Sequence, residues 1–160
     1  MKKMKLKLIL LFSILSTVLT AQNKKNVDYI SLKYSISSVV FQDAEIIVSS
    51  PNYNSKTYTI NVKYYEYTKE KTKIITISEE EFNSIVDHFY NIKSSDLIDS
   101  FEIGLDGAIT ELEIGNFLSN SINYTLWGLH KKDSNTKLKD TIETIQLILK
   151  LSEIKINDFN

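Results

Sequence analysis

The segment 78-SEEEFNSIVDHFYNI-92 is the feature that most restricts the fold of this chain. Ser78 followed by Glu81 is the sequence pattern of a capping box, and the acidic run 79–81 suits the positive end of a helix dipole. The apolar residues recur at the spacing of one helix face, at Phe82, Ile85, Val86, Phe89 and Tyr90. We therefore predict an amphipathic helix over 78–92 that packs this stripe on a sheet.

Several segments before this helix have the alternation of half-buried strands. In 29–36, Ile30, Leu32, Tyr34 and Ile36 face one way, and in 57–67 Tyr58, Ile60, Val62 and Tyr64 do the same. We predict four strands, at 29–36, 45–50, 57–67 and 72–77. The last two form a hairpin, and because no glycine marks their turn we expect a loop of several residues over 68–71.

The second half of the chain repeats this order. Segments 108–114 and 121–128 alternate and are joined by a loop-like bridge, which predicts a second hairpin. Residues 136–152 carry a helical line of apolar side chains at Leu138, Ile142, Ile145 and Leu149, after capping residues at Asp133 or Ser134. We interpret 153–160 as a polar tail whose Ile154 and Ile156 could add to a sheet edge.

The order strands, helix, strands, helix favours an α+β fold. We predict a mainly antiparallel sheet of five or six strands with two helices packed on one face. An α/β sheet with parallel edges is the alternative, and the hairpins weigh against it because parallel strands usually read as continuous apolar runs.

Three of the four glycines, Gly104, Gly107 and Gly115, lie in the segment 101-FEIGLDGAITELEIG-115. Asp106-Gly107 is the only Asp-Gly pair, and such a pair is a strong signal for a type I′ turn. Although 97–104 has no clear pattern, we interpret the pair as the turn of a hairpin with Gly104 and Gly115 near its outer ends. Whether Asp106 faces a cleft or water stays open.

The N-terminus has the three parts of a secretory signal peptide. Four lysines precede the apolar run Leu8 to Leu19, which ends at Thr20-Ala21 and is short for a membrane-spanning helix. We expect cleavage after Ala21, so that residues 1–21 are the signal peptide, 22–27 a short polar leader and 28–160 a single α+β domain. The expected location is the periplasm or the extracellular space, with no integral membrane segment left after cleavage; an uncleaved anchor is the alternative.

Composition excludes several classes of function. Removing residues 1–21 takes away four lysines and no acid, which leaves 15 basic against 20 acidic residues and a net charge of −5. This balance argues against nucleic-acid binding, which needs a basic surface. The chain has no cysteine, so disulfides, thiolate metal sites and cysteine nucleophiles are excluded.

The sequence lacks the usual patterns of catalytic and cofactor sites. His88 and His130 do not fall at metal-ligand spacing, and there is no nucleophile elbow or phosphate-binding loop. We expect two exposed histidines, no metal and no cofactor. Glu111 and Glu113 alternate with apolar residues, as on the outward face of a half-buried strand, although carboxylates in a cleft could also serve a hydrolase.

Tyr65, Tyr67 and Trp127 fall on the polar faces of their strands. If these strands share an open sheet face, they would form a surface rich in the residues that favour protein interfaces. The alternatives are that another segment covers the face, or that the tyrosines are simply good strand formers. The candidate binding residues are therefore Tyr65, Tyr67 and Trp127, with Asp106 at the expected turn.

Three hypotheses of function follow. The first is a non-enzymatic exported binding protein, of the inhibitor or immunity type, whose partner is another protein. The second is an envelope hydrolase that uses carboxylates near Asp106 and Glu111. The third is a structural envelope component, which would form a stable homo-oligomer.

Overall fold

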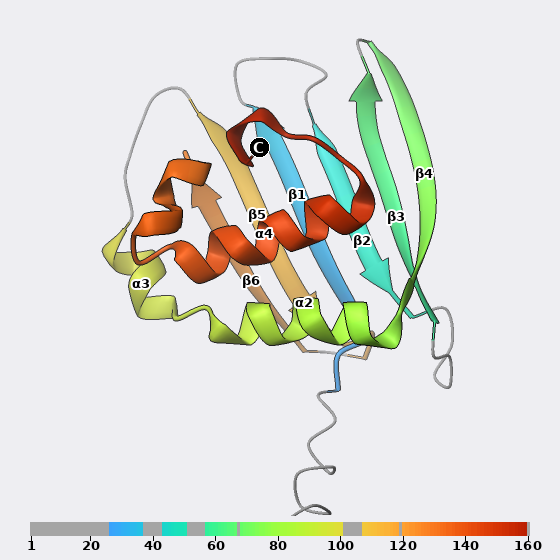
Figure 1. Cartoon of the computed structure of the whole chain (residues 1–160), viewed down its shortest axis with the longest axis horizontal. Coiled ribbons are helices and arrows are strands. Elements are labelled where there is room, and N and C mark those ends of the chain that lie inside the picture. Colours follow the sequence, from blue (N-terminus) through green and yellow to red (C-terminus); the bar gives the residue numbers. More distant parts are fainter. Residues whose placement is uncertain are drawn as a thin grey trace, which may run out of the picture.

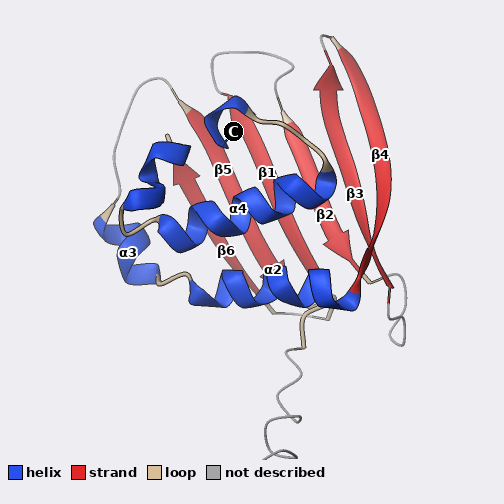
Figure 2. Cartoon of the chain, in the orientation of Figure 1, coloured by secondary structure: helices blue, strands red, loops and turns tan. Residues whose placement is uncertain are grey.

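A computed structural model of the chain describes residues 26–36, 43–50, 57–66, 68–100, 107–118 and 120–159. They form a six-stranded sheet with helices on one of its faces (Figures 1 and 2). The strands are β1 (Tyr29–Ile36), β2 (Ala44–Ser49), β3 (Thr57–Glu66), β4 (Lys69–Ser78), β5 (Ala108–Gly115) and β6 (Ser121–Trp127). The helices are α2 (Glu79–Asn91), α3 (Ser94–Asp99) and α4 (Lys139–Ser152), with short 3₁₀ turns η1 (Lys131–Asn135) and η2 (Asn157–Phe159). The predicted α+β class is confirmed.

The strand order across the sheet is β4-β3-β2-β1-β5-β6, and all five pairings are antiparallel. The first four strands form a meander that starts in the middle of the sheet and moves to one edge. After α2 and α3 the chain returns to the other side of β1, where β5 pairs with it and β6 completes the sheet. Both predicted hairpins, β3–β4 and β5–β6, are confirmed.

The core lies between the sheet and the helices. Cross-strand partners point to the same face, so the register aligns Ile60, Val48, Ile30 and Ile114 in one buried row across four strands. From α2 the side chains of Phe82, Ile85, Val86 and Phe89 pack on this face, while Tyr90 at the end of the predicted stripe is 47% exposed. Burying each of the large apolar side chains contributes about 1.5–3 kcal/mol.

The start of α2 forms as the sequence predicts. Ser78 is the N-cap: its hydroxyl accepts a hydrogen bond from the Glu81 backbone N–H at 3.2 Å, and the Glu81 carboxylate accepts one from the Ser78 N–H at 2.8 Å. The cap also marks the end of β4, so the chain turns from strand to helix without a linker. This places α2 directly over the sheet that precedes it. Among the described residues, no helix is both long enough and apolar enough to cross a membrane.

The hairpin expected around Asp106-Gly107 is wrong. Residues Ser94–Asp99 form the helix α3, and the two neighbours of β5 are β1 and β6. The Asp-Gly pair favours a turn when only its neighbours in the sequence are considered. In the fold, both sides of β5 are already paired, with β1 and β6, so a third strand cannot pair with it. Residues 101–106, including Gly104 and Asp106, lie outside the described part of the chain.

Two boundaries also differ from expectation. The β3–β4 strands extend to Glu66 and Lys69, so only two residues connect them instead of the expected longer loop. The second helix begins at Lys139 rather than Thr136, because 131–135 form a 3₁₀ turn. In that turn Asp133 accepts a hydrogen bond from the His130 N–H at 2.9 Å, so its carboxylate caps η1 and not α4.

The C-terminal residues are part of the core and not a polar tail. Ile156 and Phe159 are buried, and the rings of Phe159 and Tyr34 of β1 pack in a T-shaped arrangement with centroids 6.0 Å apart. The Tyr34 hydroxyl donates a hydrogen bond to Asp158 Oδ2 at 2.6 Å. Burial, and then this hydrogen bond to a carboxylate, raises the pKa of Tyr34 well above its usual range.

Replacing Tyr34 with phenylalanine tests how strongly this contact holds the C-terminal residues. Tyr34→Phe removes a hydrogen bond to a charged group, so the free energy of unfolding should fall by roughly 1.5–3 kcal/mol in urea denaturation at pH 7. Because the folded-state pKa is raised, the contribution is complete below the unfolded-state value of about 10 and is lost as the pH rises beyond it. The difference between wild type and Tyr34→Phe should therefore shrink between pH 9 and 11.5. A difference that does not change over this pH range would contradict the assignment.

Candidate functional site

The face of the sheet opposite the helices is the largest candidate site. In Figure 1, α2, α3 and α4 all lie on the same side of the sheet. Most residues that point to the other side are polar or charged, and Asn61, Lys63 and Thr72 are exposed there, as is the apolar Ile74. No described element covers this face. We call it the uncovered face.

Four charged residues cross the middle of the uncovered face in one row. The register pairs Lys63 with Glu45, Glu45 with Lys33, and Lys33 with Glu111, so the charges alternate in sign over four neighbouring strands. Neighbouring strands are about 4.8 Å apart, which brings each charge next to its opposite. We call these four residues the charged row.

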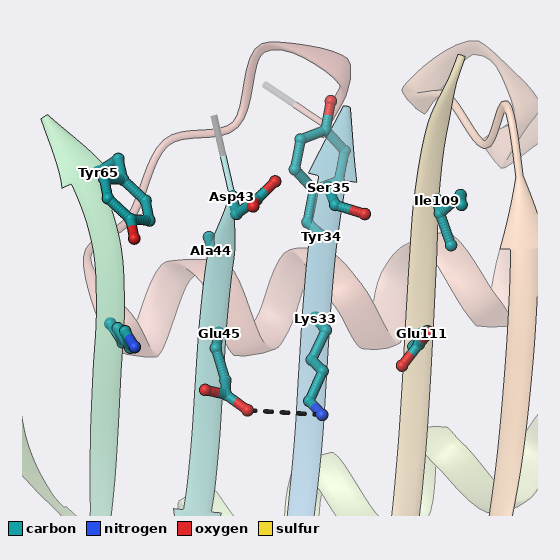
Figure 3. A pocket seen from close by; sticks show the side chains of 10 residues that line it. Lys33, Tyr34, Ser35, Asp43, Ala44, Glu45, Tyr65, Ile109 and Glu111 are labelled. Carbon is teal, nitrogen blue, oxygen red and sulfur yellow. Dashed lines mark ion pairs between the residues drawn. The ribbon is translucent and has the colours of Figure 1, made fainter. Parts of the chain in front are cut away.

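Two ion pairs involve the charged row. Lys33 Nζ lies 3.5 Å from Glu45 Oε1, as the dashed line in Figure 3 marks. Lys63 Nζ lies 3.0 Å from Glu70 Oε2 on the neighbouring strand β4, and a hydrogen bond to this carboxylate followed by its charge raises the pKa of Lys63. The Lys33 and Glu45 side chains are 52% and 39% exposed, so solvent screens their attraction and the pair adds little to stability.

A shallow hollow of about 310 Å³ lies alongside the charged row. The four row residues line it together with Asp43, Ser35, Tyr65 and Ile109, so its lining includes two lysines and three acids (Figure 3). This lining offers hydrogen-bond donors and acceptors of both signs. It is suited to hold a polar or charged side chain of a partner.

Tyr65 and Trp127 both lie on the uncovered face, but the structure does not bring them together. Tyr65 on β3 is opposite Glu70, and its hydroxyl donates a long hydrogen bond of 3.4 Å to that carboxylate. Trp127 on β6 is opposite Ile109. Strands β2, β1 and β5 lie between them, which separates the two residues by roughly 19 Å at about 4.8 Å for each strand.

The Trp127 indole ring packs on the backbone of Gly107. A Cβ atom at Gly107 would lie only 2.6 Å from Trp127 Cζ2, so a larger residue at this position would push the ring away. Gly107 therefore makes room for the indole at the start of β5. This close approach, and not a hairpin turn, is what requires glycine here.

Tyr67 and Asp106 lie outside the described residues. The proposed hydrolase pair of Asp106 and Glu111 therefore stays a prediction, although Glu111 does line the hollow.

Glu113, two residues after Glu111 on β5, accepts a hydrogen bond from the Tyr29 hydroxyl at 2.7 Å. That hydrogen bond, followed by burial, raises the pKa of Tyr29.

Neither histidine joins a group of metal ligands. His88 Nδ1 contacts the Ser84 carbonyl oxygen at 2.7 Å within α2, and His130 belongs to the cap of η1. Over the described ranges, no group of three or more histidine, cysteine, aspartate and glutamate side chains could hold a metal ion.

The sequence alone does not show that the four charged residues form one row. The alternation placed Lys33, Lys63 and Glu111 on polar strand faces, but their alignment depends on pairings between distant segments. Lys33 and Glu111 are paired through β1 and β5, which no local pattern connects. The stacked rings of Tyr29 and Phe117, whose centroids are 5.8 Å apart, also come from distant segments that no local pattern connects.

Comparison with known proteins assigns no family to this arrangement. No protein-family model matches the chain, and searches of curated proteins and of solved structures gave no significant match.

Replacing Gly107 with alanine tests the position of the indole. Because the nearest atoms belong to a side chain, we expect the ring to move rather than the backbone, with a loss of about 1–3 kcal/mol in unfolding free energy. Trp127 is the only tryptophan, so its emission should shift to longer wavelength as the ring moves into solvent. Emission that is unchanged in Gly107→Ala would show that the ring does not depend on this glycine.

Proposed function

We propose that this protein is a non-enzymatic exported binding module, of the inhibitor or immunity type, that binds another protein through the uncovered face. The observation that carries the proposal is the charged row on a sheet face that no described element covers. The expected signal peptide and the net acidic mature chain fit an exported partner-binding role. Tyr65 and Trp127 would contribute contacts at two separate points of the same face.

The charged row has more effect on recognition than on folding. Exposed ion pairs typically contribute about 0–1 kcal/mol to stability, because solvent and salt screen them. At an interface, the same alternating charges select partners with the complementary order and oppose others, since like charges brought together cost several kcal/mol. The row therefore favours a partner that presents charges of alternating sign at a similar spacing.

The size of the uncovered face also suits a protein partner. Six strands span roughly 24 Å across the sheet, and strands of six to ten residues run for a similar distance, which gives on the order of 600 Å². A specific protein interface buries about 800 Å² on each partner. The face thus supplies most of one standard interface, with Tyr29 and the exposed Phe117 able to extend it at the β5–β6 end.

The proposal can be tested by exchanging two charges within the row. The double variant Lys33→Glu/Glu111→Lys keeps the net charge but reverses the order of signs beside Glu45. We expect the wild-type mature chain to retain a specific protein from envelope extract or culture medium, and the variant to lose at least tenfold in affinity for it in a titration with the purified partner. The matched control is Lys150→Glu, which changes an exposed residue of α4 on the opposite side of the molecule and should leave the affinity unchanged.

The two other outcomes would each count against the proposal. Reproducible absence of any retained protein would argue against a binding module. A partner that binds wild type and the double variant equally well would show that the interface lies elsewhere on the molecule. Circular dichroism of the variants confirms that the fold is kept.

A further inference from the structure

The outer edge of β6 offers unpaired backbone groups. The bonds from Gly128 N to Ala108 O at 2.9 Å and from Asn116 N to Asn120 O at 3.0 Å show that even-numbered residues of β6 bond to β5. Backbone direction alternates along an antiparallel strand, so the N–H and C=O groups of Asn123 and Thr125 point away from the sheet. Since β6 is the last strand on this side, these groups have no strand to pair with among the described residues.

The two edges of the sheet differ in how they are protected. Charged side chains on an edge strand discourage pairing with another chain. The edge strand β4 carries Lys69, Glu70, Lys71 and Lys73, whereas β6, with the sequence SINYTLW, has no charged residue at all. Its isoleucine, tyrosine, threonine and tryptophan residues also favour extended structure. Of the two edges, only β6 therefore lacks protection by charged side chains.

A hollow lies beside this edge on the helix side of the sheet. In Figure 1, α3 lies beyond β6 at the side of the sheet, and Ser94 Oγ at its start is 3.4 Å from the Tyr124 hydroxyl of β6. The hollow has a volume of about 270 Å³, and its apolar lining comes from Leu97 of α3, Leu126 of β6 and the buried Leu129 and Leu138. A strand added to β6 would send every second side chain to this side, and the one beside Leu126 would enter the hollow.

We propose that the β6 edge binds an extended segment of a partner protein as a seventh strand. The outward backbone groups of Asn123 and Thr125 would bond to the segment, and the hollow lined by Leu97 and Leu126 would hold one of its apolar side chains. Main-chain bonds of this kind provide affinity, and the side-chain pocket provides specificity. This surface is separate from the uncovered face and does not depend on the function proposed for it.

A second copy of this chain fits the edge less well than a single segment. Pairing β6 with β6 of a second copy would place both helix layers on the same side of one continuous sheet, because the two-fold axis would stand perpendicular to it. Both α3 helices project beyond β6 and would then compete for the same space. One extended segment adds no helix layer and avoids this conflict.

The test selects ligands from a display library of random ten-residue peptides on the purified mature chain. We expect enriched peptides to alternate, with an apolar residue at one fixed position, and to change the emission of Trp127, which follows Leu126 at the end of β6. Bound peptide should slow hydrogen exchange at the Asn123 and Thr125 amides at least tenfold. Failure to enrich any peptide, or protection confined to β4 or to the charged row, would overturn the proposal.

A matched pair of variants isolates the backbone contact. Thr125→Pro removes an N–H that bonds to no described residue, and proline is tolerated on an edge strand where the N–H faces outward. We expect it to weaken the selected peptide at least tenfold, while Thr125→Val, which keeps the N–H, binds as wild type does. Equal affinity for all three proteins would contradict strand addition. The exchange measurement uses the unmodified chain, so it decides the question even if Thr125→Pro fails to fold.

Discussion

The packing of α2 and α4 on one face of the sheet is the constraint on which the other features of the structure depend. Once Phe82, Ile85 and Ile145 are buried against Ile30 and its row, the two-residue period of the strands sends every intervening side chain to the other face. A register shift of one residue in β1 would place Lys33 in the core and Leu32 in solvent. The hydrophobic core therefore fixes the charged row, although no row residue takes part in it.

Local physics accounts for the parts of the fold that could be predicted from the sequence. The Ser78–Glu81 cap, the α2 stripe and the alternation in β1, β3 and β5 each involve residues close together in the chain, so the pattern carries the information. The pairing of β1 with β5 joins residues at least 72 positions apart, and neither strand shows which partner it takes. For this reason Lys33 and Glu111 could be assigned to polar faces but not to each other. Contacts between distant segments could not be predicted, and for this reason Asp106-Gly107 was interpreted as a hairpin turn and the C-terminal residues as a tail.

The surface divides into regions with different physical properties. The uncovered face carries charges of both signs in a fixed order, which favours selective contact with a complementary surface. The β4 edge carries lysines, whose hydration opposes the approach of another strand. The β6 edge carries no charged side chain and lies beside a hollow whose apolar part is lined by Leu97 and Leu126. A partner that used both the face and the β6 edge would contact adjoining surfaces, because Asn123 and Thr125 point their side chains to the same side as Glu111.

The position of β1 in the middle of the sheet has a consequence for synthesis of the chain. β1 is made first, but its partner β5 begins at Ala108, 72 residues after Ile36. At about 5–20 residues per second, roughly 4–14 seconds pass before translation supplies that partner. Phe159 and Asp158, which pack on Tyr34, follow later still. A nascent chain of this kind keeps its first strand half-paired until β5 has been made, which leaves time for any chaperone or translocation machinery to engage it before the core can close.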